Sequence, residues 1–379
     1  MALSHTPLPP ERVAGLSPAA AKALGPGPGR MMAARGLVPL PSAAEMVTVL
    51  YQVAVLEPGL AAAAAATASG LPEGVLTGAL AEPSLPPVVL DWLAPKLRGR
   101  GALFEALVLA PAVADDTVVE LAGQGSAAQV DLIASNEQRL LRCPDIIAAM
   151  YANPHARMST VDRAVELAAR SGVRVSGISA WDELVRLLTS GPPGAHVSDD
   201  TGFAKALAGV GAVADAAIIA PDDRAGEDGV AIAEGEDQAP AVDEAEVPIS
   251  KLGIPAKIRL ATLGNAFARA ILIRDPMKMV AVAAIKSPGV TDLEAAKYAG
   301  NHALCDDVIR YVATRRDWTR LYGVKKSLIL NPKTPITESS KLLVHMRERD
   351  LRLISTSKGI PSAVGAQARK LVSQRAGKK

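Results

Sequence analysis

Cationic and aromatic residues alternate in one stretch near the C-terminal end of the sequence. Trp318 and Tyr322 stand among six Lys and Arg residues, and three further arginines follow. Cations can neutralise phosphates and aromatic rings can stack on bases, so the pattern is typical of a nucleic-acid surface. The alternative is that Trp318 and Tyr322, four residues apart, share the buried face of one helix whose outer face is cationic. The nine cations of this candidate basic surface are Arg315, Arg316, Arg320, Lys325, Lys326, Lys333, Arg347, Arg349 and Arg352.

Residues suited to nucleophilic catalysis or metal binding are few and scattered. The sequence has five His and two Cys, too few for a Cys/His metal cluster or a disulfide framework. His5 and His196 fall in segments that we expect to be disordered. No local motif joins any of the other three, His155, His302 and His345, to a nucleophile and an orienting group. We therefore expect no catalytic residue, no cofactor and no metal, and we expect that the protein is not an enzyme.

Paired carboxylates have a structural interpretation. Asp115-Asp116 and Asp306-Asp307 precede apolar patterns of helical spacing, and negative charge is favourable at the positive end of a helix dipole. We expect both pairs to begin helices. The four-residue spacing of Asp306 with Arg310, and of Glu348 with Arg352, predicts ordinary surface ion pairs.

Charge and composition divide the sequence into four segments. Residues 1–34 are rich in Pro and Gly, which predicts a disordered arm. Residues 35–191 carry short stretches of helical periodicity and predict a helical-repeat domain. Residues 192–246 hold 13 Asp and Glu against Lys205 and Arg224, a net charge of −11, so we expect 192–250 to be a disordered acidic linker, with a short Ala-rich helix from Phe203 to Ile219 as the alternative for that part. Residues 251–379 return to helical periodicity with 25 Lys and Arg against 9 Asp and Glu, a net charge of +16, which predicts a basic helical-repeat domain.

The sequence shows no signal for a membrane or for export. Its first residues lack the basic region and apolar run of a secretory signal. The longest uncharged apolar stretch, 58–72, is shorter than the roughly 20 residues that cross a bilayer. We expect a cytoplasmic protein without a transmembrane segment.

Similar turns recur between the predicted helices. In these turns a polar residue can cap the start of the next helix, and Pro fits the first turn of that helix. The turns appear at intervals typical of stacked helical repeats. The stretch from Ala110-Pro111 to Ala122 aligns with Ser287-Pro288 to Ala299 at an offset of 177 residues. Asn153-Pro154 aligns with Asn331-Pro332 at an offset of 178. The two offsets indicate that the two domains are copies of one module, with chance reuse of turn chemistry as the alternative.

At these turns the chain resembles bacterial α-helical repeat proteins of the leucine-rich-repeat-variant and HEAT-like class. Asn331-Pro332-Lys333-Thr334-Pro335 matches the Asn-Pro-x-Thr-Pro turn of that class in full, whereas Asn153-Pro154-His155 lacks the Thr-Pro and Ala110-Pro111 lacks the Asn. The resemblance covers about 75–188 and 258–371. It implies a stacked all-helical fold that serves as a binding surface or scaffold.

We therefore expect an all-α fold of two stacked helical-repeat, α-solenoid-like modules joined by the acidic linker. The leading hypothesis is a cytoplasmic interaction scaffold that binds a protein partner through helical-repeat surfaces. The alternative is a nucleic-acid-binding protein that uses the basic C-terminal module, with the acidic linker as an intramolecular competitor. A weaker third possibility is attachment to anionic lipid through the same cations.

If the linker competes in this way, deleting residues 192–246 raises the apparent affinity of the chain for nucleic acid, because it removes 13 carboxylates next to the basic domain. Titration of duplex nucleic acid across a salt series measures this change. An unchanged affinity would contradict competition by the linker.

Overall fold

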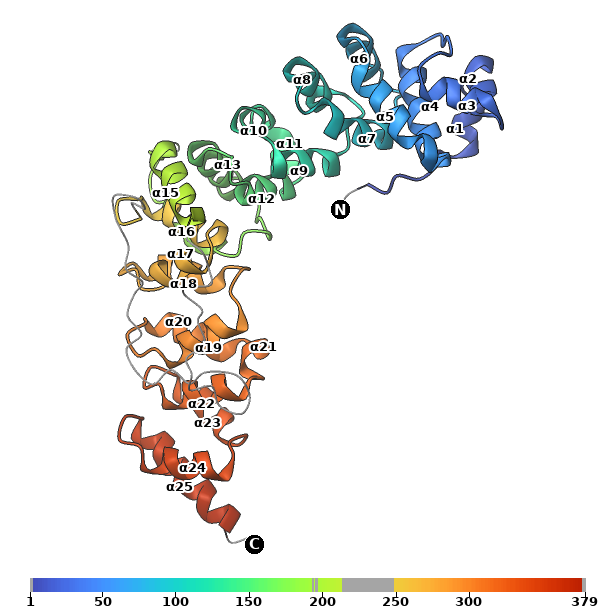
Figure 1. Cartoon of the computed structure of the whole chain (residues 1–379). Coiled ribbons are helices and arrows are strands. Elements are labelled where there is room, and N and C mark those ends of the chain that lie inside the picture. The colour runs from blue at the N-terminus through green and yellow to red at the C-terminus, as the bar shows by residue number, and fades with distance from the viewer. Residues whose placement is uncertain (1–2, 193, 195–196, 213–248, 377–379) are drawn as a thin grey trace. The chain divides into compact units, whose positions relative to one another are not determined.

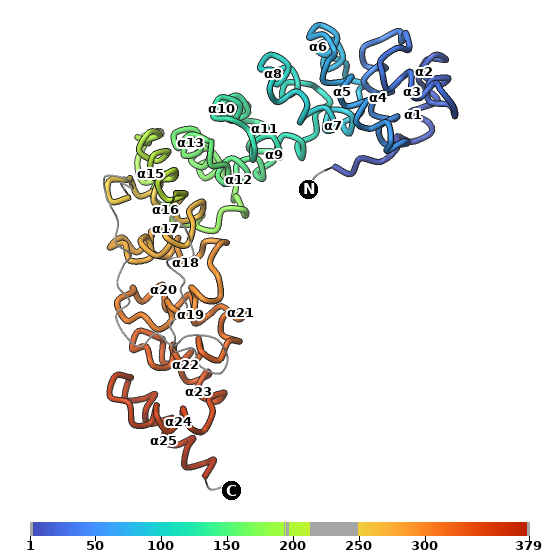
Figure 2. Tube along the Cα trace, in the orientation of Figure 1, coloured from blue at the N-terminus to red at the C-terminus, as the bar shows by residue number. Residues whose placement is uncertain are grey.

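The computed structural model describes residues 3–192, 194, 197–212 and 249–376. Every regular element within these residues is a helix, which confirms the all-α fold class (Figure 1). The chain divides into two compact units, Met1–Gly177 (unit 1) and Ile178–Lys379 (unit 2), which we describe separately. Within each unit, neighbouring helices in the sequence lie side by side, as the trace in Figure 2 shows.

The helices are short, and most begin at a Pro, a capping residue or an acidic first turn. Unit 1 contains α1 (Pro10–Ala14), α2 (Pro18–Leu24), α3 (Pro28–Ala34), α4 (Ala43–Leu56), the 3₁₀ turn η1 (Pro58–Leu60), α5 (Ala61–Gly70), α6 (Glu73–Leu80), α7 (Pro87–Leu97), α8 (Gly101–Leu109), α9 (Asp115–Gln124), α10 (Ala127–Ala134), α11 (Glu137–Arg142), α12 (Asp145–Ala152) and α13 (Met158–Arg170). Unit 2 contains α14 (Trp181–Leu188), α15 (Asp200–Ala212), α16 (Ile254–Leu263), α17 (Ala266–Leu272), α18 (Lys278–Lys286), α19 (Asp292–Gly300), α20 (Asp306–Thr314), α21 (Arg316–Thr319), α22 (Tyr322–Leu330), α23 (Ile336–Leu343), α24 (Glu348–Thr356) and α25 (Ser362–Ala376).

The predicted disordered arm, 1–34, is wrong for most of its length. Pro10, Pro18 and Pro28 stand in the first turns of α1, α2 and α3, where proline fits because that turn has no use for its missing N–H. α2 and α3 also pack on α4 and bury several alanines. Proline and glycine here separate short helices instead of preventing them.

The predicted boundaries of the acidic linker, 192–250, are wrong at the N-terminal side. α15 lies inside that range and buries Phe203, whose ring sits 4.8 Å from the fully buried guanidinium carbon of Arg259 in α16. Asn265 donates from Nδ2 to the carbonyl of Val210 at 3.0 Å. The rest of the predicted linker, 213–248, lies outside the described residues. The division between units also comes earlier than predicted, because α14 belongs to unit 2, where Glu183 pairs with Lys286 at 2.8 Å.

Two buried asparagines bind backbone carbonyls at the end of an earlier helix. Asn153 follows α12 and donates from Nδ2 to the carbonyls of Ala122 and Gly125, both at 2.8 Å, at the end of α9. Asn331 follows α22 and donates to the carbonyls of Ala299 and Asn301, at 3.0 and 3.3 Å, at the end of α19. The Oδ1 atom of each accepts the backbone N–H two residues later, which shapes the turn.

Other polar side chains make the same kind of bond. Each donates to a carbonyl at or shortly after the end of a helix, 28 to 32 residues earlier, where a backbone acceptor has no partner within its helix. These bonds run from Arg100 to Ser69 and Leu71, from Gln129 to Arg98, from Arg139 to Val108, from Lys333 to Leu304, and from Arg375 to Met346 and Val344.

A buried ion pair joins α17 to α19 in unit 2. Arg269 makes a bidentate contact with Glu294, at 2.9 and 3.1 Å, and both side chains are less than a tenth exposed. Glu294 also completes a capping box with Thr291 at the start of α19. A Cβ atom at Gly289 would lie 2.8 Å from Nη1 of Arg269, so a larger residue here would push the guanidinium away from its present position.

Asn331 and Asn301 form a matched pair for testing these bonds. Both are buried and directly follow the last residue of a helix, but Nδ2 of Asn301 has no hydrogen-bond partner among the described residues. We expect Asn331→Ala to destabilise the protein by roughly 2–4 kcal/mol, because it strands two buried carbonyls. Asn301→Ala should cost less, because it loses only the bond that its Oδ1 accepts from the N–H of Ala303 at 2.8 Å, and Asn331→Ala loses the equivalent bond as well.

Urea unfolding followed by circular dichroism measures both changes. Equal losses of stability in the two variants would show that the bonds from Asn331 to the preceding helix contribute little.

Candidate binding surfaces

The nine cations of the predicted basic surface all lie in unit 2, on or between α20 and α24. Three of them already serve contacts within the protein. Lys326 pairs with Asp350 at 3.1 Å, and Lys333 donates to the carbonyl of Leu304 at 2.6 Å. Arg352 pairs with Glu348 on the surface of α24, as its four-residue spacing predicts. The prediction for Asp306 with Arg310 is wrong, because Arg310 lies nearest to Asp307, at 3.9 Å.

Two further cations stack on aromatic rings. The guanidinium carbon of Arg315 lies 5.6 Å from the ring centres of both Tyr311 and Trp318. That of Arg347 lies 4.6 Å from the ring of Tyr322. Such stacking holds the planar guanidinium in place and is worth about 0.5–1 kcal/mol at an exposed site. Arg315 and Arg347 each occupy the position just before a helix, α21 and α24.

The aromatic residues of this cluster do not offer a free face for bases. Trp318 is only 7% exposed and packs edge-to-face on Tyr311. Tyr322 is half-buried beneath Arg347, and its hydroxyl donates to Asp350. The expectation that Trp318 and Tyr322 share one helical face is also wrong, because the chain turns between α21 and α22 and places them on separate helices.

All six arginines of the predicted surface are exposed, and Arg316, Arg320 and Arg349 differ from the other three in making no side-chain contact of the kinds above. No described residue forms a hydrogen bond or ion pair with the side chains of these three. Lys325 is half-buried on α22. The chemistry available at this surface is therefore attraction of anionic groups by guanidinium side chains, with Arg315 and Arg347 held beside them.

The Asp350 carboxylate connects α22 to α24. Burial opposes its ionisation, but the hydrogen bond from Tyr322 and the ion pair with Lys326 outweigh burial and lower the pKa of Asp350 below its usual range. Burial, and then the bond to Asp350, raise the pKa of Tyr322, so its hydroxyl stays a donor.

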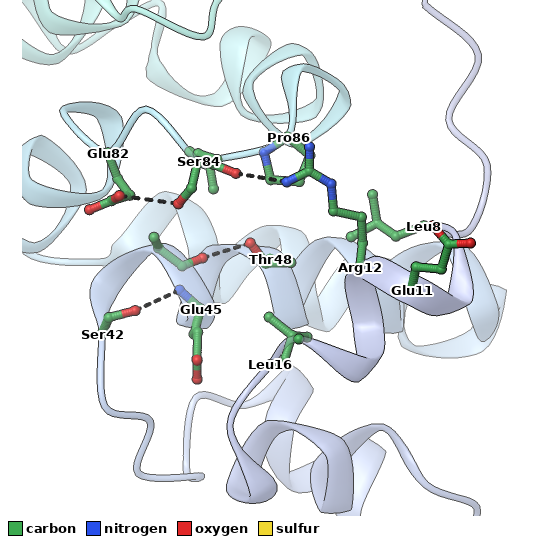
Figure 3. A pocket seen from close by; sticks show the side chains of 13 residues that line it. Leu8, Glu11, Arg12, Leu16, Ser42, Glu45, Thr48, Glu82, Ser84 and Pro86 are labelled. Carbon is green, nitrogen blue, oxygen red and sulfur yellow. Dashed lines mark hydrogen bonds between the residues drawn. The ribbon is translucent and has the colours of Figure 1, made fainter.

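Unit 1 has a cavity of 410 Å³ between α1, α4 and the α6–α7 turn (Figure 3). Several of its polar groups are hydrogen-bonded: Arg12 reaches the carbonyl of Ser84 at 3.5 Å, and Ser42 caps the N–H of Glu45. Glu45 in turn accepts two bonds from Ser17, at 2.6 and 3.1 Å. The polar side chains around the cavity therefore help to hold α1 and α2 in place beside α4.

The predicted catalytic and metal-ligating residue types do not converge. No group of three His, Cys, Asp or Glu side chains suited to a metal occurs in the described ranges.

Asp115-Asp116 and Asp306-Asp307 begin α9 and α20, as predicted. His5 lies in the predicted disordered arm, yet it binds the buried carboxylate of Asp91 at 2.9 Å, a contact that no local sequence pattern indicates. Among the helices that the structure describes, none has the length and apolarity to cross a bilayer.

Comparison of the chain with protein-family models, with curated proteins and with solved structures finds no match.

The lowered pKa of Asp350 predicts a pH-dependent contribution to stability. A carboxylate with a depressed folded pKa stabilises the protein above its unfolded pKa of about 4, and this stability is lost as the pH falls through the folded pKa. We expect Asp350→Asn to lower the melting temperature most above pH ~5, with the difference from wild type shrinking in stronger acid.

Thermal melting from acid to neutral pH measures this difference. Asp317→Asn is the control, because Asp317 is exposed on α21 and has no polar side-chain partner in the described part of the chain. A deficit of Asp350→Asn that is the same at every pH would contradict the assignment.

Proposed function

We propose that this protein is a non-enzymatic interaction scaffold of stacked helical repeats, similar to the HEAT-like and leucine-rich-repeat-variant class. In this proposal the basic surface of unit 2 binds an acidic segment of a protein partner. The observation that carries the proposal is the series of side-chain bonds to carbonyls 28 to 32 residues earlier.

A narrow range of offsets is what a repeat architecture with units of similar length requires. In a solenoid each repeat contacts only its neighbours, so contacts recur at one repeat length and extend one surface along the chain. The bonds from Asn153 and Asn331, in different units, run to equivalent positions at the end of a helix. They support one module used in both units.

The state of the cations favours a protein partner. Arg316, Arg320 and Arg349 are exposed, and Arg315 and Arg347 are held on aromatic rings. Arginine is enriched at protein interfaces and binds carboxylates through two parallel hydrogen bonds. Because Trp318 is buried and Arg347 covers Tyr322, the cluster lacks a free ring on which a single-stranded base would stack.

Nucleic acid is the second candidate, and the net charge of +16 over residues 251–379 favours it. Without free rings, this surface would contact phosphates and not bases. Binding would then fall steeply with salt and would not prefer single strands over a duplex. The deletion that tests the acidic segment has to spare α15, so it covers 213–246 and not 192–246.

Charge reversal of Arg316, Arg320 and Arg349 tests the proposal. We expect Arg316→Glu, Arg320→Glu and Arg349→Glu together to weaken binding of a Glu-rich peptide roughly tenfold or more, because like charges then face each other. The matched control reverses Lys278, Arg310 and Lys341, which are exposed cations of the same unit that each lie near an acidic residue. Both triple variants have the same net charge.

Fluorescence anisotropy of the labelled peptide, and of a labelled DNA duplex, gives the affinities over a salt series. Tight binding of the duplex with none of the peptide would replace the protein partner by nucleic acid. Equal losses in both triple variants would show that net charge, and not this surface, decides binding.

A further inference from the structure

The segment from Leu3 to Pro9 forms no regular secondary structure and lies against α4 and α7 of unit 1. In the view of Figure 1 it runs beneath α4 to the start of α1. Pro7, Pro9 and Pro10 fix their own backbone φ angles and disfavour helix in the residues before them. Pro9 has φ −55° and ψ 144°, close to polyproline II. The N–H of Thr6 bonds to the carbonyl of Ser4 at 3.0 Å in a tight turn at His5, so it is the part after this turn, with its three prolines, that the sequence holds extended.

Two side chains of α4 grip the backbone of this segment. The Tyr51 hydroxyl donates to the carbonyl of Thr6 at 2.8 Å, and Gln52 Oε1 accepts the N–H of Leu8 at 2.8 Å. Burial, and then the charge of Asp91, raise the pKa of Tyr51, which keeps its hydroxyl a donor. Neither bond involves a side chain of the segment, so another extended peptide can form both.

Two side chains of the segment enter specific sites. His5 Nε2 donates to Asp91 Oδ2 at 2.9 Å, and Asp91, 7% exposed, also accepts the hydroxyl of Thr117 at 2.6 Å. Leu8, three residues after His5, is 7% exposed. The first side chain, His5, is itself exposed, but it binds a buried carboxylate, which favours a basic group. The second, Leu8, is buried at the edge of the 410 Å³ cavity, which favours an apolar group.

Aromatic rings lie beside the segment. His5 packs on Tyr51 with ring centres 6.1 Å apart, and Tyr51 packs edge-to-face on Trp92 of α7 at 5.9 Å. Grooves that recognise polyproline II combine aromatic walls with polar groups that bind the ligand's backbone, because such a ligand loses little conformational entropy on binding.

We propose that the groove between α4 and α7 is a binding site for an extended, proline-rich segment of a partner protein, with a basic residue three positions before an apolar one. The N-terminal segment of this chain occupies the groove as an internal ligand and competes with the partner. The site goes beyond the basic surface of unit 2, and it stands whether or not that surface binds an anionic partner.

The test uses the full chain and a fluorescein-labelled peptide with the sequence of residues 3–10. A tethered segment acts at an effective concentration on the order of millimolar, so the wild-type chain should bind the peptide weakly. The double variant His5→Ala, Leu8→Ala loosens the internal segment, and we expect it to bind the peptide at least tenfold more tightly. Adding Tyr51→Phe and Gln52→Ala to that variant should reverse most of the gain.

The control is Thr6→Ala, which keeps the carbonyl that Tyr51 binds and alters only an exposed side chain. It should behave as wild type. Equal binding of the peptide by the wild-type chain and the double variant would overturn the proposal. So would equal binding of a peptide in which the His and Leu are both replaced by Ala.

A measurement on the wild-type chain covers the case in which the double variant fails to fold. Millimolar unlabelled peptide should displace the internal segment and speed hydrogen exchange at the amide of Leu8 several-fold, whereas the Ala-substituted peptide should not. Unchanged exchange would overturn the proposal. A wild-type dimer that exchanges its N-terminal segments would overturn it too, because the occupant would then be a second copy of this chain.

Discussion

Short helices leave a large share of their carbonyl groups without a partner, and this constraint organises the whole chain. Helices such as α9, α19 and α22 span only 9 or 10 residues, and the last four carbonyls of any helix receive no hydrogen bond from an N–H of the same helix. Asn153, Asn331 and the other donors, which come later in the sequence, bind such carbonyls. A helix therefore depends on the same neighbouring segment for the packing of its apolar face and for hydrogen bonds to its terminal carbonyls.

The sequence predicts the helices and turns well because their determinants are local. Asn331-Pro332 and Asn153-Pro154 mark helix ends, and Asp115-Asp116 marks a beginning, through chemistry that acts within a few residues. The prolines of residues 1–34 predict breaks in regular structure, whereas Pro18 and Pro28 in fact begin helices. The difference between the two roles depends on burial against α4, which no local pattern contains.

The candidate surface was predictable only as a group of cations. Which of them is engaged within the protein depends on residues from other helices: Asp350 engages Lys326, the carbonyl of Leu304 engages Lys333, and Tyr322 lies under Arg347. The groove was not predictable at all, because His5 and Asp91 are 86 residues apart and neither stands in a motif. Its one local signal is the run of prolines that keeps the segment extended.

Asn153 and Asn331 bind main-chain carbonyls, and main-chain carbonyls are the same in every sequence. A helix bound to an earlier helix in this way places little demand on the earlier helix's side chains. If the chain is the proposed stack of helical repeats, duplication, loss or exchange of one repeat by recombination leaves this joint intact, and the outward residues are then free to diverge. The chain can in this way lengthen or change what it recognises without having to evolve a new interior at the same time.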